Sequence, residues 1–216
     1  MSVTAPAVEA FSEAELLRRV CRLSFRRFVK EFWASVPGAA PLVHNWHMDV
    51  ICKELQHVAE RVFKGLSVEH DLIFNVPPGT SKTTLCSILF PAWVWTRMPN
   101  ARILSASHTN DLVMDLATKA RAVITSELYS ELFPEIELTA DQDVKTYYRN
   151  TAGGDRYTCT VSGRSPMGFH AHFHLCDDLL NPKTARSIVE VLEARKFLVE
   201  ELPTRKVDKA VTPCIL

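Results

Sequence analysis

The stretch of sequence that decides the fold is residues 72–84, which read LIFNVPPGTSKTT. Its first five residues are mostly apolar, with β-branched and aromatic side chains, and they predict a short buried strand over residues 71–76. The Pro-Pro-Gly that follows predicts a sharp turn, and the apolar spacing beyond it predicts a helix over residues 82–96. A strand, a tight loop and a helix that opens on Lys82 and Thr83 form the arrangement that binds nucleoside triphosphates.

The chemistry of this arrangement depends on the loop and the first helical turn. We expect their backbone N–H groups to face the phosphates, whose negative charge the helix dipole favours. Lys82 would neutralise the β and γ oxygens of ATP, and the hydroxyl of Thr83 would ligate Mg²⁺. The predicted nucleotide-binding residues of this segment are Pro78, Gly79, Thr80, Ser81, Lys82, Thr83 and Thr84.

The loop departs from the usual pattern of glycines. That pattern has glycine six residues and one residue before the lysine, where this chain has Val76 and Ser81. Gly79 supplies some conformational freedom and Ser81 is small, but a residue other than glycine resists a positive φ. Taken alone, the segment could also be an ordinary strand-to-helix turn with an exposed lysine.

A pair of carboxylates ends a second predicted strand. Residues 171–178 read AHFHLCDD, a strand-like run that finishes on Asp177 and Asp178. In a parallel ATPase sheet, a strand beside the phosphate loop ends near the same edge, so its acids reach the metal and the γ-phosphate. Asp177 would hold Mg²⁺, and Asp178 would orient and deprotonate the attacking water. The alternative is that both residues merely begin the next helix, where aspartate is favoured.

Taken in order, these segments resemble the large terminase subunit of tailed bacteriophages, the motor that packages DNA into proheads. The resemblance covers most of residues 44–215. The segments that carry it are Pro77–Thr84 (the phosphate loop), Phe90–Trp93 and Arg97–Leu104 (a helix end and the second strand), Ser105–His108 (the next loop), Gly154, Arg156, Gly163 and Met167–Ala171 (a hairpin and glycine turn), and Asp177–Asp178 with Asn181–Lys183 (the acid ending).

The resemblance implies a P-loop NTPase fold and an ATPase that uses ATP and Mg²⁺. It also implies a homo-oligomeric ring that translocates double-stranded DNA, with the portal protein and the small terminase subunit as partners, in the host cell cytoplasm. In terminases the region before the motor strands helps to hold adenine, so Trp46 and His47 are candidates for base contacts; the alternative is plain packing.

Two family features are missing from the sequence. The phosphate loop has no arginine, so a transition-state arginine would come from Arg156, Arg164 or a neighbouring subunit. The nuclease domain that follows the motor in the family has no counterpart in these 216 residues, so we expect no nuclease activity from this chain.

The composition sets wider bounds. With 216 residues and 47% hydrophobic content, the chain can bury one substantial core. Lysine plus arginine and aspartate plus glutamate balance at 25 each, so DNA would have to be bound by a local patch. The six cysteines are widely spaced, which favours reduced thiols in the cytosol, and no apolar run is long enough to predict a membrane span.

The remaining patterns predict an α/β fold, a mostly parallel twisted sheet with helices on both faces. Strands are expected at 71–76, 101–106, 156–161, 171–176 and 210–215, and helices at 82–96, 109–127 and 183–200, with loop and hairpin over 130–155. A disordered tail (1–10), an amphipathic helix (12–33) and a linker precede a helix that begins near residue 44. The predicted domains are residues 1–41, the tail, helix and linker, and residues 42–216, the ATPase.

Three alternatives remain open at this stage. The alternating His170, His172, His174 and Cys176 would share one strand face and could suggest zinc, but ligands spread along one straight strand rarely surround an ion, so we expect hydrogen-bonded core histidines. The basic side of the 12–33 helix is either a solvated face or a surface that contacts phosphates or another subunit. The chain could also be a nucleotide-binding remnant or assembly module without turnover, or a helicase-like ATPase, which would need a second motor domain.

Overall fold

The computed structural model describes residues 11–139, 146–163, 168–181, 183 and 186–216. The predicted tail and Arg164 lie outside these residues. The described part contains a five-stranded sheet in the order β2-β3-β1-β4-β5. Only the β2–β3 pair is antiparallel, so the prediction of a mostly parallel sheet is confirmed. The strands are β1 (Arg102–Ser107), β2 (Tyr147–Arg149), β3 (Asp155–Thr160), β4 (Phe173–Cys176) and β5 (Cys214–Ile215).

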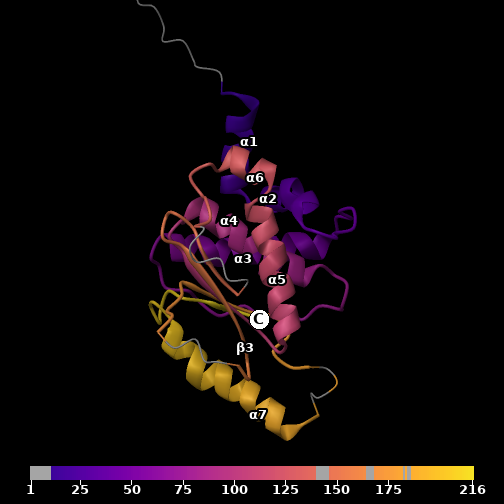
Figure 1. The fold of residues 1–216 in the computed structure, drawn as a ribbon, viewed down its shortest axis with the longest axis vertical. Coiled ribbons are helices and arrows are strands. Elements are labelled where there is room, and N and C mark those ends of the chain that lie inside the picture. The colour runs from indigo at the N-terminus through magenta and orange to yellow at the C-terminus, as the bar shows by residue number, and fades with distance from the viewer. Residues whose placement is uncertain (1–10, 140–145, 164–167, 182, 184–185) are drawn as a thin grey trace, which may run out of the picture.

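Helices cover both faces of this sheet, as predicted. One face packs against the helices that precede β4, and α7 lies on the other side (Figure 1). Side chains alternate between the faces: Ile103 belongs to the larger core under the first group of helices, and Leu104 to a smaller core with Phe197. The helices are α1 (Glu13–Leu23), α2 (Phe25–Phe32), α3 (Trp46–Phe63), α4 (Phe90–Arg97), α5 (Asn110–Ile124), α6 (Glu127–Leu132) and α7 (Ile188–Lys196).

The predicted amphipathic helix over residues 12–33 forms two helices instead of one. Ser24 has an extended backbone (φ −135°), and its hydroxyl accepts from the N–H of Arg27 to cap α2. After the break, α2 packs Phe25, Phe28 and Phe32 into the core that residues of α3, α4 and α5 also form. All three side chains are fully buried. The proposed boundary between residues 41 and 42 therefore separates segments that share one hydrophobic core.

The predicted strand over residues 71–76 is only partly formed. Leu72 makes a single parallel bridge to Ile215, and the Phe74 N–H donates to the Leu216 carbonyl. This extended segment lies beside β5, whose two paired residues offer too little backbone for a regular strand. β5 therefore separates the segment from β4, so the prediction that the acid-bearing strand lies directly beside the strand that precedes the loop is wrong.

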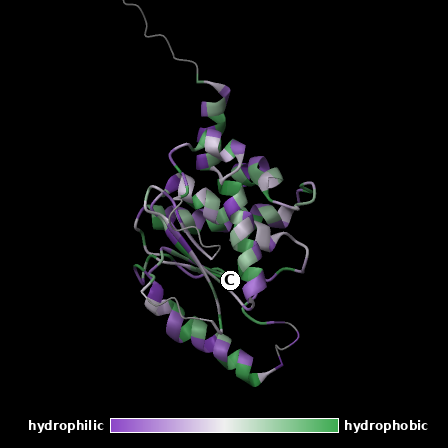
Figure 2. Cartoon of the chain, in the orientation of Figure 1, coloured by the Kyte–Doolittle hydropathy of each residue, from purple (hydrophilic) through white to green (hydrophobic). Residues whose placement is uncertain are grey.

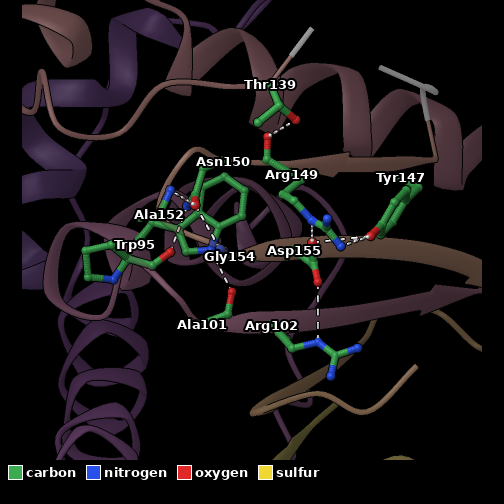
Figure 3. A network of polar contacts seen from close by, with 11 residues as sticks. Trp95, Ala101, Arg102, Thr139, Tyr147, Arg149, Asn150, Ala152, Gly154 and Asp155 are labelled. Atoms are coloured by element: carbon green, nitrogen blue, oxygen red, sulfur yellow. Dashed lines mark hydrogen bonds and ion pairs between the residues drawn. The ribbon is translucent and has the colours of Figure 1, made fainter. Parts of the chain in front are cut away.

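The β2–β3 hairpin confirms the prediction of a hairpin within residues 130–155. The Asp155 carboxylate accepts from Arg149 and Tyr147 and pairs with Arg102 on β1 (Figure 3). The turn is held by Asn150, whose side-chain oxygen accepts from two backbone N–H groups. Because these bonds join three strands, they fix one edge of the sheet.

α7, the helix on the other face of the sheet, carries apolar residues at exposed positions as well as against the sheet. α7 continues through η4 (Phe197–Glu201) and η5 (Leu202–Arg205), and it packs on the sheet through Ala194, Phe197 and Leu202. Its outer side carries exposed apolar residues, seen as green bands in Figure 2. These residues are Ile188, Val189, Leu192 and Val199. Within the described residues, no helix is long and apolar enough to cross a membrane.

Candidate functional site

The Pro77–Ser81 loop leads directly into a helix that spans residues 82–97. This helix begins as an α-helical turn at Lys82 and Thr83, continues through the π-helical segment η2 (Thr84–Leu89) and ends as α4. Val76 to Thr83, together with Asp178, line a cavity of about 360 Å³. The predicted residues Pro78, Gly79, Thr80, Ser81, Lys82 and Thr83 thus surround one space, and Thr84 does not line it.

The backbone of the loop takes the conformation that glycine would favour. Gly79 has φ 81° and Ser81 has φ 66°, both in the left-handed region. For a residue other than glycine this costs free energy and persists only where the surroundings impose it. The Ser81 carbonyl accepts from the Leu85 N–H, and the Thr80 hydroxyl donates to the Pro77 carbonyl at 2.7 Å. Serine therefore replaces the usual glycine before Lys82 without changing the local turn.

Lys82 connects this loop to the acid pair. Its Nζ lies 3.2 Å from Asp177 Oδ1 and 3.3 Å from Asp178 Oδ1. Burial lowers the pKa of Lys82, but the two carboxylates outweigh that effect and raise it above its ordinary value. The ammonium group is therefore charged at neutral pH, and Lys82 is one of the residues that line the cavity.

The two carboxylates differ in their surroundings. Asp177 is buried, its N–H donates to the Ala106 carbonyl, and the Ser87 hydroxyl donates to its Oδ2 at 3.4 Å. The Asp178 side chain is 58% exposed and faces the cavity. A held, buried carboxylate beside an accessible one suits one anchoring role and one reactive role.

The backbone of Asp178 is strained. Its φ is 48°, and its carbonyl accepts from the His108 N–H at 3.1 Å, from His108 Nδ1 at 2.6 Å and from the Ser107 hydroxyl at 3.4 Å. Ser107 and His108 were not among the predicted site residues. Their signal in the sequence was their position at the end of a predicted strand that is parallel to the acid strand.

The two candidates for base contacts are placed differently. Asn45 caps α3, so Trp46 and His47 form its first turn. His47 Nε2 lies 3.0 Å from the Thr80 carbonyl and donates to it, since a carbonyl only accepts. Trp46 is 74% exposed and lines no part of the cavity. The structure therefore brings His47 to the loop and leaves the Trp46 ring in solvent beside it.

Arg156, a candidate for the transition-state arginine, has a structural role. It is buried on β3, and its Nη2 donates to the Ser87 carbonyl at 2.7 Å. Ser87 belongs to the π-helical segment η2, so this side-chain donor reaches the backbone of an irregular, buried part of the helix. Nη1 donates to the Tyr148 hydroxyl at 3.3 Å. Arg156 therefore supports η2 and does not line the cavity, so it is not placed to act on a bound phosphate.

The expectation of core histidines holds fully only for His174, which is buried on β4; His172 is half-buried just before that strand, and His170 is exposed. His172 Nδ1 accepts from the Arg102 N–H at 2.9 Å, and His174 Nε2 donates to the Arg205 carbonyl at 3.2 Å. Burial lowers the pKa of His174 to about 4. The described residues contain no group of three histidine, cysteine or acidic side chains placed to hold a metal ion.

The donor atoms around the cavity still fit Mg²⁺ when a nucleotide supplies the remaining ligands. Mg²⁺ prefers oxygen and is usually held by one or two carboxylates, with phosphates and waters completing its shell. The ligands offered here are oxygen atoms only, from Asp177, Asp178 and the Thr83 hydroxyl. A metal ion that is shared with a nucleotide does not require three acidic residues from the protein. The residues present are therefore compatible with a metal–nucleotide complex.

Comparison with known proteins gives one informative result. No family model matches the sequence, and no curated protein matches it. Among solved structures, the HK97 bacteriophage large terminase superimposes with a TM-score of 0.55 over 95% of this chain, at 10% sequence identity. The chain has a terminase-like fold. It spans 37% of the length of that terminase, and at this identity the likeness concerns the fold alone.

Proposed function

We propose that this chain is the ATP-hydrolysing motor domain of a viral terminase, which powers the translocation of double-stranded DNA into proheads. The observation that carries the proposal is the contact of Lys82 Nζ with both Asp177 and Asp178 beside the loop cavity that Lys82 and Asp178 line. The terminase-like fold supports an ATPase in general. Phosphoryl transfer needs positioning and charge neutralisation more than covalent chemistry, which is what these groups offer.

In this proposal the loop binds the triphosphate. The first N–H groups of a helix have no partner within the helix, so those of this helix are available to an anion bound at the loop. Lys82 leaves the carboxylates and turns to the β and γ oxygens. His47 steadies the loop through Thr80, and the exposed Trp46 ring stacks on the base.

The acid pair performs the chemical step. Asp177 and the Thr83 hydroxyl would hold Mg²⁺, which would supply positive charge against the phosphates. Asp178 accepts a proton from the attacking water, because its exposed carboxylate faces the cavity. Since Arg156 is engaged by Ser87 and Tyr148, the arginine that stabilises the transition state comes from Arg164 or from a neighbouring subunit of a ring.

The test is phosphate release from ATP with and without Mg²⁺ and double-stranded DNA. We expect Mg²⁺-dependent turnover that Lys82→Ala abolishes and Asp178→Asn lowers by about a hundredfold or more. The exposed Lys53 on α3 gives a matched control, since Lys53→Ala removes the same charge far along the chain from the loop. Unchanged turnover in Lys82→Ala would overturn the proposal. Nucleotide binding without turnover in the unmodified chain would favour the alternative, a binding or assembly module.

A further inference from the structure

We infer that His108, with Ser107, positions Asp178 for catalysis by clamping its carbonyl in a strained backbone conformation. The inference rests on the proposed ATPase and assigns a role to two residues at the end of β1. His108 is half-buried and contacts the Asp178 backbone, so it acts through Asp178 and does not touch the reacting atoms itself.

The first argument is the strain at Asp178. A φ of 48° is uncommon for a residue other than glycine, although aspartate tolerates it better than most. Without support, the peptide would relax to an ordinary conformation and turn the carboxylate to a new direction. Such strain is retained where neighbouring groups determine it, and here the neighbouring groups are three donors on one carbonyl.

The second argument is the rigidity of the clamp. Ser107 is the last residue of β1, which lies in the middle of the sheet, and it is buried. Thr109 follows His108 at once and caps α5 by accepting from the Leu112 N–H. The His108 backbone is therefore held by a strand on one side and a helix on the other. Its Nδ1 must carry the proton, because the carbonyl oxygen of Asp178 can only accept.

The third argument is the weak hold on the Asp178 carboxylate itself. Within the described residues, its only side-chain partner is Lys82, at 3.3 Å, and the carboxylate is more than half exposed. In the proposed mechanism Lys82 turns to the nucleotide, so the carboxylate then loses that partner. The backbone clamp is what keeps it directed toward the attacking water at that stage.

The experiment compares four variants by their turnover of Mg²⁺–ATP. His108→Asn keeps an N–H donor near the place of Nδ1, because the asparagine amide nitrogen is equally far from the backbone. His108→Gln moves the donor by one bond, and His108→Ala removes it. His57→Ala is the control, since His57 is an exposed histidine on α3. Thermal unfolding of each variant reports whether it folds.

We expect kcat to fall about tenfold or more in His108→Ala and in His108→Gln, with the KM for ATP changed less than about threefold. His108→Asn should stay within about threefold of the unmodified chain in kcat. Two results would overturn the inference. One is a kcat equal to that of the unmodified chain in all four variants. The other is an equal loss of kcat in His108→Asn and His108→Gln while both remain folded. If His108→Ala does not fold, the Asn and Gln pair decides. If the proposed function itself is wrong, the result differs from these, because the unmodified chain then shows no turnover that Lys82→Ala removes.

Discussion

Replacement of Arg156 by methionine tests the structural role that removes this arginine from the catalytic site. The change takes away the charged donor to the Ser87 carbonyl inside a buried region. A hydrogen bond from a charged group contributes about 1.5–3 kcal/mol, and loss of the longer bond to Tyr148 adds less. Methionine also removes the buried Arg156 Nε, which has no hydrogen-bond partner among the described residues, and this offsets part of the cost. We expect the free energy of unfolding to fall by about 2 kcal/mol.

The assay is chemical denaturation, together with a double-mutant cycle. For a chain of this size, 2 kcal/mol corresponds to a decrease of about 4–8 °C in Tm. Tyr148→Phe removes only the longer bond to Nη1, so in that background Arg156→Met should still cost more than about half as much. Loss of the cost in that background would refute the idea that the bond to the Ser87 carbonyl is the main contribution of Arg156.

Three further predictions follow from the site and the core. Ser81→Gly should retain turnover, because glycine adopts a φ of 66° readily. Ser81→Val should lower the free energy of unfolding by about 1–2 kcal/mol, which denaturation measures. It should also weaken nucleotide binding, which titration with fluorescent ATP measures. His174 has a pKa lowered by burial to about 4, so only the unfolded chain takes up its proton between pH 6.5 and 4. Stability should therefore fall by up to about 3 kcal/mol as the pH decreases through that range, and His174→Gln should flatten the profile. Trp46→Ala should leave Tm unchanged and raise the Kd for ATP; an unchanged Kd would remove Trp46 from the base site.

The order of segments in the sequence predicted more than any single residue pattern could. A lysine at a strand-to-helix loop and a later acid pair at a strand end belong to one sheet edge when the sheet is parallel. The structure places Lys82 against Asp177 and Asp178 accordingly. A strand was predicted over residues 210–215, and β5 lies at its end, but its position between the loop segment and β4 depends on the order of strands in the sheet, which no local pattern gives.

Other features depend on tertiary contacts that no local pattern shows. The break at Ser24 follows from a cap and from the packing of Phe25, while the apolar spacing runs through it without interruption. The hydrogen bond of Arg156 to the Ser87 carbonyl joins residues 69 positions apart, which no local pattern shows. The sequence marked His108 only as part of a loop. Its contact with Asp178 depends on the adjacency of β1 and β4, which no local pattern shows.

A crystal structure of this chain with Mg²⁺ and a non-hydrolysable ATP analogue would test the central claim most directly. The account predicts the triphosphate in the cavity lined by Val76–Thr83, with Lys82 Nζ moved from the carboxylates to within hydrogen-bonding distance of the β and γ oxygens. An analogue bound elsewhere, with Lys82 still paired to Asp177 and Asp178, would contradict it.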